Sequence, residues 1–198
     1  ELHALDGQAT IGAVPSSVAS VCRSRAPKVD EAFVREVSER ETVTNHDVAA
    51  FVDVVQQRIG GAEAAWEHHG LTSSDVVDTA WCAMLRDAAE LIDAALGELV
   101  GVLVREARRH RDTPMIGRTH GIHAEPTTCG VKLAQAHAEF QRARERLVMA
   151  RKEIATCAIS GAVGTFANID PRVEEYVAEK MGLTPEPVST QVIPRDRH

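Results

Sequence analysis

Two long stretches of helical periodicity limit what this chain can fold into. From Ser73 to about His110, apolar residues recur every three or four positions, over roughly 36 residues or about 54 Å of helix. Pro126 opens a second such stretch, which runs to about Cys157. Because helices this long need antiparallel partners, the pattern predicts an elongated helical bundle.

Shorter helices are predicted on both sides of these stretches. Three of them have capping signals: residues 30–40 with Asp30, residues 45–59 with Asn45, and residues 170–182 between Asp170-Pro171 and Gly182. A further helix is expected from about Gln191. Residues 111–125 are predicted to be an irregular connection, and no segment shows the alternation of a strand. The sequence therefore predicts an all-α fold, with a small helical N-terminal domain (residues 1–88) followed by part of an elongated bundle (residues 89–198).

Charge and cysteine content narrow the class of protein. The formal net charge is −7, which excludes a general nucleic-acid surface, so an anionic ligand has to be held by local groups against the overall charge. No apolar run approaches the ~18 residues of a membrane span, and the first residues do not form a signal peptide. Scattered cysteines indicate reduced core residues of a cytoplasmic protein rather than a disulfide set or a zinc site: Cys22, Cys82, Cys129 and Cys157.

Two polar clusters lie at predicted helix starts. In "TNHDV", residues 44–48, Asn45 or Asp47 could simply cap a helix. In "HHGLTSSDVVDTA", residues 68–80, hydroxyl and backbone N–H groups gather at the start of the long helix, an arrangement that favours a carboxylate or phosphate. An ordinary N-cap is the alternative there, although two adjacent histidines add nothing to a cap.

The third cluster is "MIGRTHGIHAEPTTCG", residues 115–130. His120 and His123 lie among glycines that let a ligand approach closely, and an imidazole suits acid–base work near neutral pH. Arg118 could hold a carboxylate, and a polar connection between helices is the alternative. We expect no metal, because the sequence has no H-E-x-x-H and no cysteine pair. The three clusters together indicate acid–base chemistry on an anionic substrate.

Five motifs in order resemble the adenylosuccinate lyase family of the fumarase/aspartase superfamily: "TNHDVAAF", "HHGLTSSDVVDTA", "GRTHGIHAEPTT", "SGAVGTFANIDP" and "STQVIPRDRH". The resemblance implies a helical bundle of the fumarase/aspartase type and β-elimination of fumarate from adenylosuccinate, giving AMP. The same site would split succinyl-carboxamide imidazole ribotide (SAICAR) to its carboxamide (AICAR). It further implies no cofactor and a homotetramer whose active sites are shared between subunits.

The resemblance also assigns roles to individual residues. His120 matches the general acid that protonates the departing nitrogen, and His68 matches a histidine near the reacting end. The remaining matches are substrate-binding residues: Asn45, His46, Asp47, Thr72, Ser73, Thr119 and Gln191. It gives no role to His69, Arg118 or His123.

Part of the family pattern is missing from these residues. The serine loop resembling "GSSxMPxKxNP", which supplies the general base, and an N-terminal Arg-Tyr segment that binds phosphate are absent. We therefore expect the chain to be part of a longer protein and to be inactive by itself. Two alternatives are another lyase of the superfamily, of the argininosuccinate lyase or carboxymuconate cycloisomerase type, and a non-catalytic structural relative. "THGIHAEPTT" argues against the first, and intact His120, His68 and Thr72-Ser73 argue against the second.

Overall fold

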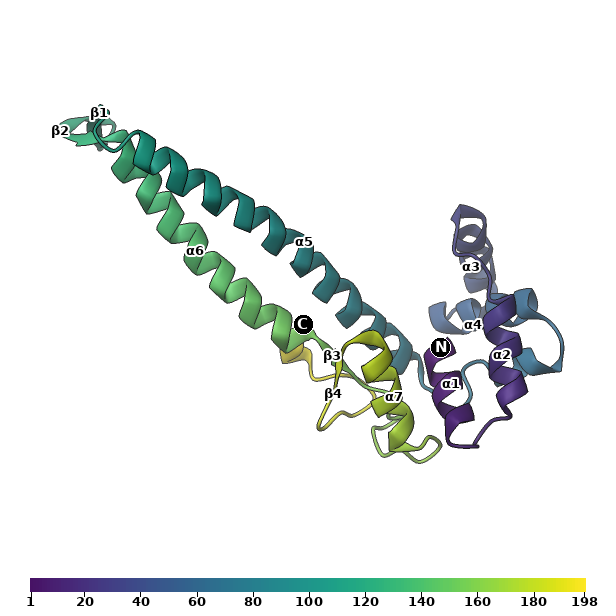
Figure 1. The fold of residues 1–198 in the computed structure, drawn as a ribbon. Helices are drawn as coiled ribbons and strands as arrows, with labels where there is room; N and C mark the ends of the chain where they lie inside the picture. Colours follow the sequence, from purple (N-terminus) through teal and green to yellow (C-terminus); the bar gives the residue numbers. More distant parts are fainter. The chain divides into compact units, whose positions relative to one another are not determined.

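Helices dominate the computed structural model, which describes residues 1–198 (Figure 1). The chain divides into two compact units, one formed by Glu1–Met84 with Ala155–His198 and the other by Leu85–Ile154. Most elements belong to the first unit: α1 (Leu2–Thr10), α2 (Ser16–Arg25), α3 (Glu31–Thr44), α4 (Asp47–Ile59), η1 (Ala62–Trp66), the start of α5 (Ser73–Arg109), β3 (Thr156–Cys157), α7 (Pro171–Met181), β4 (Thr184–Pro185) and η2 (Arg195–Arg197). The second unit holds the rest of α5, β1 (Pro114–Thr119), β2 (Ile122–Thr128) and α6 (Cys129–Ile154).

The first unit has two hydrophobic clusters. One joins α1, α2, α3 and α4, and its buried members include Leu5, Val18, Phe33 and Val54. The other packs α7 against the segment that follows α6, with buried Ile159, Ile169, Val173 and Val177. Both clusters bury the apolar stripe of an amphipathic helix, which is where most of a helix's stability in a protein comes from.

Capping signals placed two helices correctly. The Asp30 side chain accepts the Phe33 N–H at the start of α3. The Asp170 side chain accepts the Arg172 N–H, Pro171 is the first residue of α7, and Gly182 ends that helix in the left-handed conformation. These predictions are confirmed because caps depend on local sequence.

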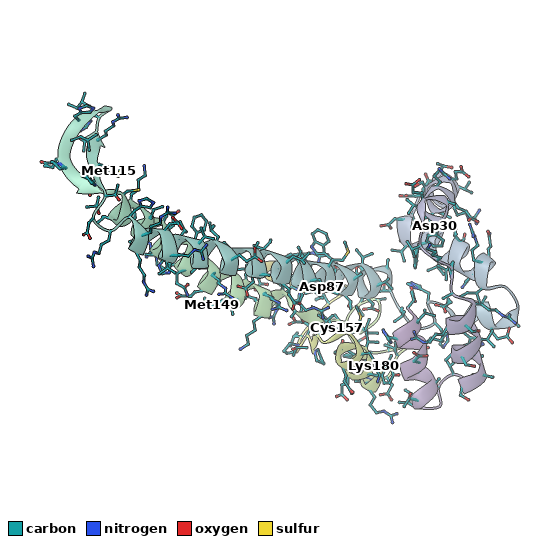
Figure 2. The ribbon with its side chains drawn as sticks, turned by 45° about the horizontal axis from the view of Figure 1, so that its top comes forward. Asp30, Asp87, Met115, Met149, Cys157 and Lys180 are labelled. Carbon is teal, nitrogen blue, oxygen red and sulfur yellow. The ribbon has the colours of Figure 1, made fainter.

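The second unit is a pair of long helices joined by a hairpin (Figure 1). The 37 residues of α5 confirm the predicted long helix, and α6 confirms the second one. Two ion pairs link the helices, Arg144 with Asp93 at 2.6 Å and Arg151 with Glu90 at 3.0 Å. Figure 2 shows side chains along the whole length of the pair, with Met149 on α6.

The sequence analysis predicts no strands, and this is its main error, because the structure contains a β-hairpin. Residues 114–119 and 122–128 form an antiparallel hairpin, so Pro126 lies in a strand and α6 begins at Cys129 instead. The strands escaped prediction because both faces are largely exposed, which removes the hydrophobic alternation that marks a half-buried strand. A second, two-residue parallel pairing joins β3 to β4.

Smaller differences occur near the ends of the chain. The structure has helices α1 and α2 where no element was predicted, and a three-residue 3-10 helix, Arg195–Arg197, in place of the helix expected from Gln191. The domain boundary at residue 88 stays a prediction. The two compact units are defined by contacts within this chain and do not test it.

Candidate functional site

A polar cavity of about 560 Å³ brings the first two sequence clusters together. His46 enters it from the start of α4, His68 and His69 from the connection after η1, and Ser73 from the first turn of α5. These residues belong to one compact unit. Segments predicted separately to bind substrate therefore share one cavity.

The first cluster is a junction between two helices. Asn45 adopts a left-handed conformation (φ 50°) and ends α3, so it does not cap α4 as predicted. The cap is His46, whose Nδ1 accepts the Ala49 N–H at 3.3 Å. Asp47 is the first residue of α4 and accepts the Val48 N–H at 2.8 Å. The same Nδ1 lies 3.3 Å from Oδ1 of Asp47.

His68 is held in an uncommon backbone conformation, with φ 68°. Its Nδ1 lies 2.8 Å from Oε1 of Glu1, and since a carboxylate only accepts, Nδ1 carries the proton. The Nε2 atom is left for other partners. His69 packs its ring edge-on against Trp66, with the ring centroids 5.0 Å apart, so this histidine has a packing role.

The glycine after the two histidines allows a close approach between distant segments. Gly70 has φ 75°, and a Cβ at this position would lie 2.5 Å from the Asn168 carbonyl oxygen. Gly164 likewise lies against the backbone of Ser189 and Thr190. The "HHGLTSSDVVDTA", "SGAVGTFANIDP" and "STQVIPRDRH" motifs are therefore neighbours in space.

Asp75 occupies the first turn of α5 and is only 2% exposed. Its Oδ2 accepts the Thr72 N–H at 2.9 Å, which is the backward contact of a capping box. The same carboxylate accepts N–H groups from Ser160 at 3.0 Å and Gly161 at 3.1 Å. Burial raises the pKa of Asp75, and these three N–H groups oppose that shift.

Asp78 makes equivalent contacts one turn further along α5. Its Oδ2 accepts the Ile193 N–H and an N–H of the Arg195 guanidinium, each at 3.0 Å. Gln191 lies two residues before Ile193, so this contact ties the predicted glutamine to the helix that begins at Ser73. Gln191 itself is exposed.

His120 lies at the tip of the β1–β2 hairpin in the other unit. Thr119 pairs with Ile122, so His120 and Gly121 form a two-residue loop with φ of 51° and 76°. Positive φ at both positions is typical of a type I′ hairpin turn. His120 is exposed and makes no hydrogen bond within the chain. The predicted acid and its neighbour Thr119 are thus on a projecting hairpin.

Glu67 is a buried group that no sequence pattern singles out. It is 4% exposed and adjoins both the polar cavity and an apolar cavity of about 360 Å³, yet no N–H or O–H group donates to its carboxyl oxygens. Burial and the nearby Glu1 raise the pKa of this carboxyl. Asp75 was also missed as a functional residue, although the Thr72-x-x-Asp75 spacing of a capping box is visible in the sequence.

Three of the four cysteines are core residues, as the sequence predicts, and Cys129 is half-buried. All four are unpaired, and Cys22, Cys82 and Cys157 are buried. Burial raises the pKa of Cys22 to about 11 and that of Cys157 to about 12, so these thiols are not nucleophiles at neutral pH. No three His, Cys, Asp or Glu side chains lie together as metal ligands would. No helix is both long and apolar enough to cross a membrane.

A mainly helical chain with imidazoles and a helix start around one polar cavity is suited to binding an anion and moving protons. The family model described as "Lyase" matches residues 7–198, and the chain belongs to this lyase family.

Among curated proteins, adenylosuccinate lyases are similar over the whole chain. The identity is 45% with that of Bacillus subtilis (strain 168), over 100% of this chain and 45% of the relative. It is 46% with that of Staphylococcus saprophyticus, with the same coverage. The resemblance seen in the motifs is confirmed, and the chain spans about half the length of these relatives.

Solved structures confirm the helical fold class. The 3-carboxy-cis,cis-muconate lactonizing enzyme from Pseudomonas putida has a TM-score of 0.90 and 31% identity, over 100% of this chain and 46% of that one. A fumarate lyase from Mesorhizobium sp. BNC1 has a TM-score of 0.86 and 28% identity, over 96% of this chain and 45% of that one.

Proposed function

We propose that this chain is part of an adenylosuccinate lyase, which eliminates fumarate from adenylosuccinate and from SAICAR in purine nucleotide biosynthesis. The observation that carries the proposal is the polar cavity shared by His46, His68 and Ser73, taken with the similarity to adenylosuccinate lyases over the whole chain. Both reactions break a C–N bond next to a carbon that carries an acidic hydrogen. They need a base, an acid and sites for anionic groups, but no cofactor.

The start of α5 is proposed to bind an anionic group of the substrate. The hydroxyl groups of Thr72 and Ser73 make no hydrogen bonds within the chain, and the Asp75 N–H that a capping Thr72 hydroxyl would accept donates instead to the Thr72 carbonyl at 3.1 Å. The start of a long helix attracts negative charge through its free N–H groups and its dipole. Asn45, His46, Asp47 and Gln191 are proposed as further substrate contacts.

Proton transfer is assigned to His120, with His68 in support. A base removes the proton beside the substrate carboxylate, the electron pair forms the new C=C bond, and the C–N bond breaks. His120 delivers its proton to the departing nitrogen, which leaves more easily once it is neutralised. Thr119, beside His120 on the hairpin, contacts the fumarate part. The base is a serine outside these 198 residues.

A homotetramer with shared active sites is proposed as the working form. Apolar side chains along α5 and α6 are uncovered, with Leu91 75% exposed, Ile92 52% and Met149 68%. Exposed apolar surface on this scale marks a site of association, and other copies of the long helices would bury it in a cytoplasmic bundle. In that assembly residues 1–88 form the N-terminal domain and residues 89–198 the first part of the bundle.

A second candidate is a carboxymuconate cycloisomerase, favoured by the structural match of TM-score 0.90. Its identity of 31% is lower than the 45–46% with adenylosuccinate lyases, which is why we place it second.

The test is an absorbance assay on the full-length protein with adenylosuccinate, argininosuccinate and 3-carboxy-cis,cis-muconate as separate substrates. We expect turnover of adenylosuccinate alone. Turnover of either other substrate without adenylosuccinate would overturn the proposal, and inactivity on all three would favour a structural relative.

A further inference from the structure

One turn of α5 carries two buried carboxylates that contact different distant loops. Asp75 and Asp78 are 2% and 5% exposed. Asp75 accepts backbone N–H groups from the loop at residues 160–161, which lies 85 residues along the chain. Asp78 accepts the N–H of Ile193, 115 residues along the chain. Residues 160, 161 and 193 lie outside helices and strands, so their backbone N–H groups have no partner in regular secondary structure and donate to these two side chains.

Each anchor lies beside residues that the proposed function places on the substrate. Asp75 holds the Thr72 N–H as well as the 160–161 loop, which fixes the backbone that carries the Thr72 and Ser73 hydroxyls. Asp78 holds the segment that carries Gln191. A hydroxyl contact, Ser160 Oγ to Ser189 Oγ at 2.7 Å, joins the two loops directly.

The chemistry of the two anchors also favours a role in fixing geometry. A buried carboxylate costs free energy unless several donors satisfy it, and here each oxygen that is used receives a backbone N–H at 2.9–3.1 Å. Hydrogen bonds to an ionised acceptor are stronger than neutral ones. The donors to Asp75 are all backbone N–H groups, which cannot change rotamer, and Asp78 receives the Arg195 guanidinium in addition to a backbone N–H. The arrangement therefore fixes main-chain positions to a degree that hydroxyl or amide side chains would not.

We propose that Asp75 and Asp78 are positioning residues, which hold the Thr72-Ser73 helix start and the Gln191 segment in one fixed arrangement for an anionic substrate. We assign neither carboxylate a contact with substrate, because Asp75 is 2% and Asp78 5% exposed and their hydrogen bonds are directed at other segments of the chain. Their kinetic role rests on the proposed function, whereas the anchoring itself does not.

The chain offers a matched control for this proposal. Glu174 on α7 is 5% exposed and accepts the Ile159 N–H at 2.8 Å, one residue before the segment that Asp75 holds. Glu174→Gln removes a buried carboxylate bonded to the adjoining stretch of backbone, and Glu174 makes no hydrogen bond with the start of α5 although its carboxyl lies near enough to Asp75 to repel it. Asp75→Asn and Asp78→Asn are the test variants, because asparagine keeps the shape and loses the charge.

The first measurement is steady-state kinetics of the full-length enzyme with adenylosuccinate. We expect Asp75→Asn and Asp78→Asn to raise KM at least about tenfold with kcat within about threefold of the unaltered enzyme, because displaced binding groups weaken substrate positioning. Glu174→Gln should lower thermal stability without changing KM. Equal stability losses in all three variants with unchanged KM would overturn the positioning role.

The second measurement needs no substrate. Hydrogen exchange of individual amides by mass spectrometry should show slow exchange at Ser160, Gly161 and Ile193 in the unaltered enzyme. Protection should be lost at residues 160–161 in Asp75→Asn and at Ile193 in Asp78→Asn. Fast exchange at these amides in the unaltered enzyme would overturn the anchoring even if no variant folds. Failure of the unaltered enzyme to turn over adenylosuccinate would refute the proposed function and leave this measurement to decide the anchoring.

Discussion

Replacing Gly70 by alanine should destabilise the protein in two ways, through backbone strain and through a steric conflict with Asn168. A left-handed backbone costs a residue with a Cβ about 1–2 kcal/mol. The Gly70 Cβ would also lie 2.5 Å from the Asn168 carbonyl oxygen, a backbone atom that cannot rotate away. Overpacking of this kind adds about 1–3 kcal/mol, so Gly70→Ala should lower the free energy of unfolding by about 2–5 kcal/mol.

Gly12→Ala is the matched control. Gly12 has φ 78°, close to the 75° of Gly70, but a Cβ there would have nothing within 4 Å. Only the backbone cost remains, so this variant should lose about 1–2 kcal/mol. Urea unfolding of both full-length variants at one protein concentration, followed by circular dichroism, measures the difference. Equal losses in the two variants would refute the inference that Gly70 is required by its contact with Asn168.

Other predictions concern single side chains. His120→Ala should lower kcat by at least about a hundredfold, the usual effect of losing a general acid, and turnover like that of the unaltered enzyme would remove His120 from this role. The hydrogen bond from the Arg172 guanidinium lowers the pKa of Asp170 to about 2. The stabilising effect of this carboxylate is therefore present above about pH 4 and lost as the pH falls through about 2, and acid titration of unfolding in Asp170→Asn should lack that step. A thiol reagent followed by peptide mapping should label half-buried Cys129 before Cys22 and Cys157, which are both 0% exposed.

Elements that depend on local sequence could be predicted, and elements that depend on pairing could not. The apolar period of α5 and the caps at Asp30 and Asp170 are properties of neighbouring residues. The β1–β2 hairpin depends on the turn at His120-Gly121 and on pairing between exposed strands, which leave no hydrophobic alternation. Residues 115–130 were correctly identified as a polar cluster, but their shape was not.

The backbone conformation of Asn45 explains why the predicted cap of α4 was wrong. Asn and His can both cap a helix, and Asn is the commoner choice. Because Asn45 is used in the left-handed conformation to end α3, the capping position of α4 moves to His46. The contacts of Asp75 with residues 160–161 are beyond any periodicity argument, since they join segments 85 residues apart.

The local electrostatics of the polar cavity explain how a chain of net charge −7 suits the anionic substrate that we propose. Two carboxyl groups line this cavity, and each has a feature that reduces its negative charge there. Asp53 is paired with the Arg40 guanidinium at 2.6 Å. Burial raises the pKa of Glu67, which favours the neutral acid. The Glu1 carboxylate beside His68 is compensated in part by the Nδ1–H of that ring. The positive end of the α5 dipole then favours an anion, and distant surface acids, screened by salt, add little repulsion at the site.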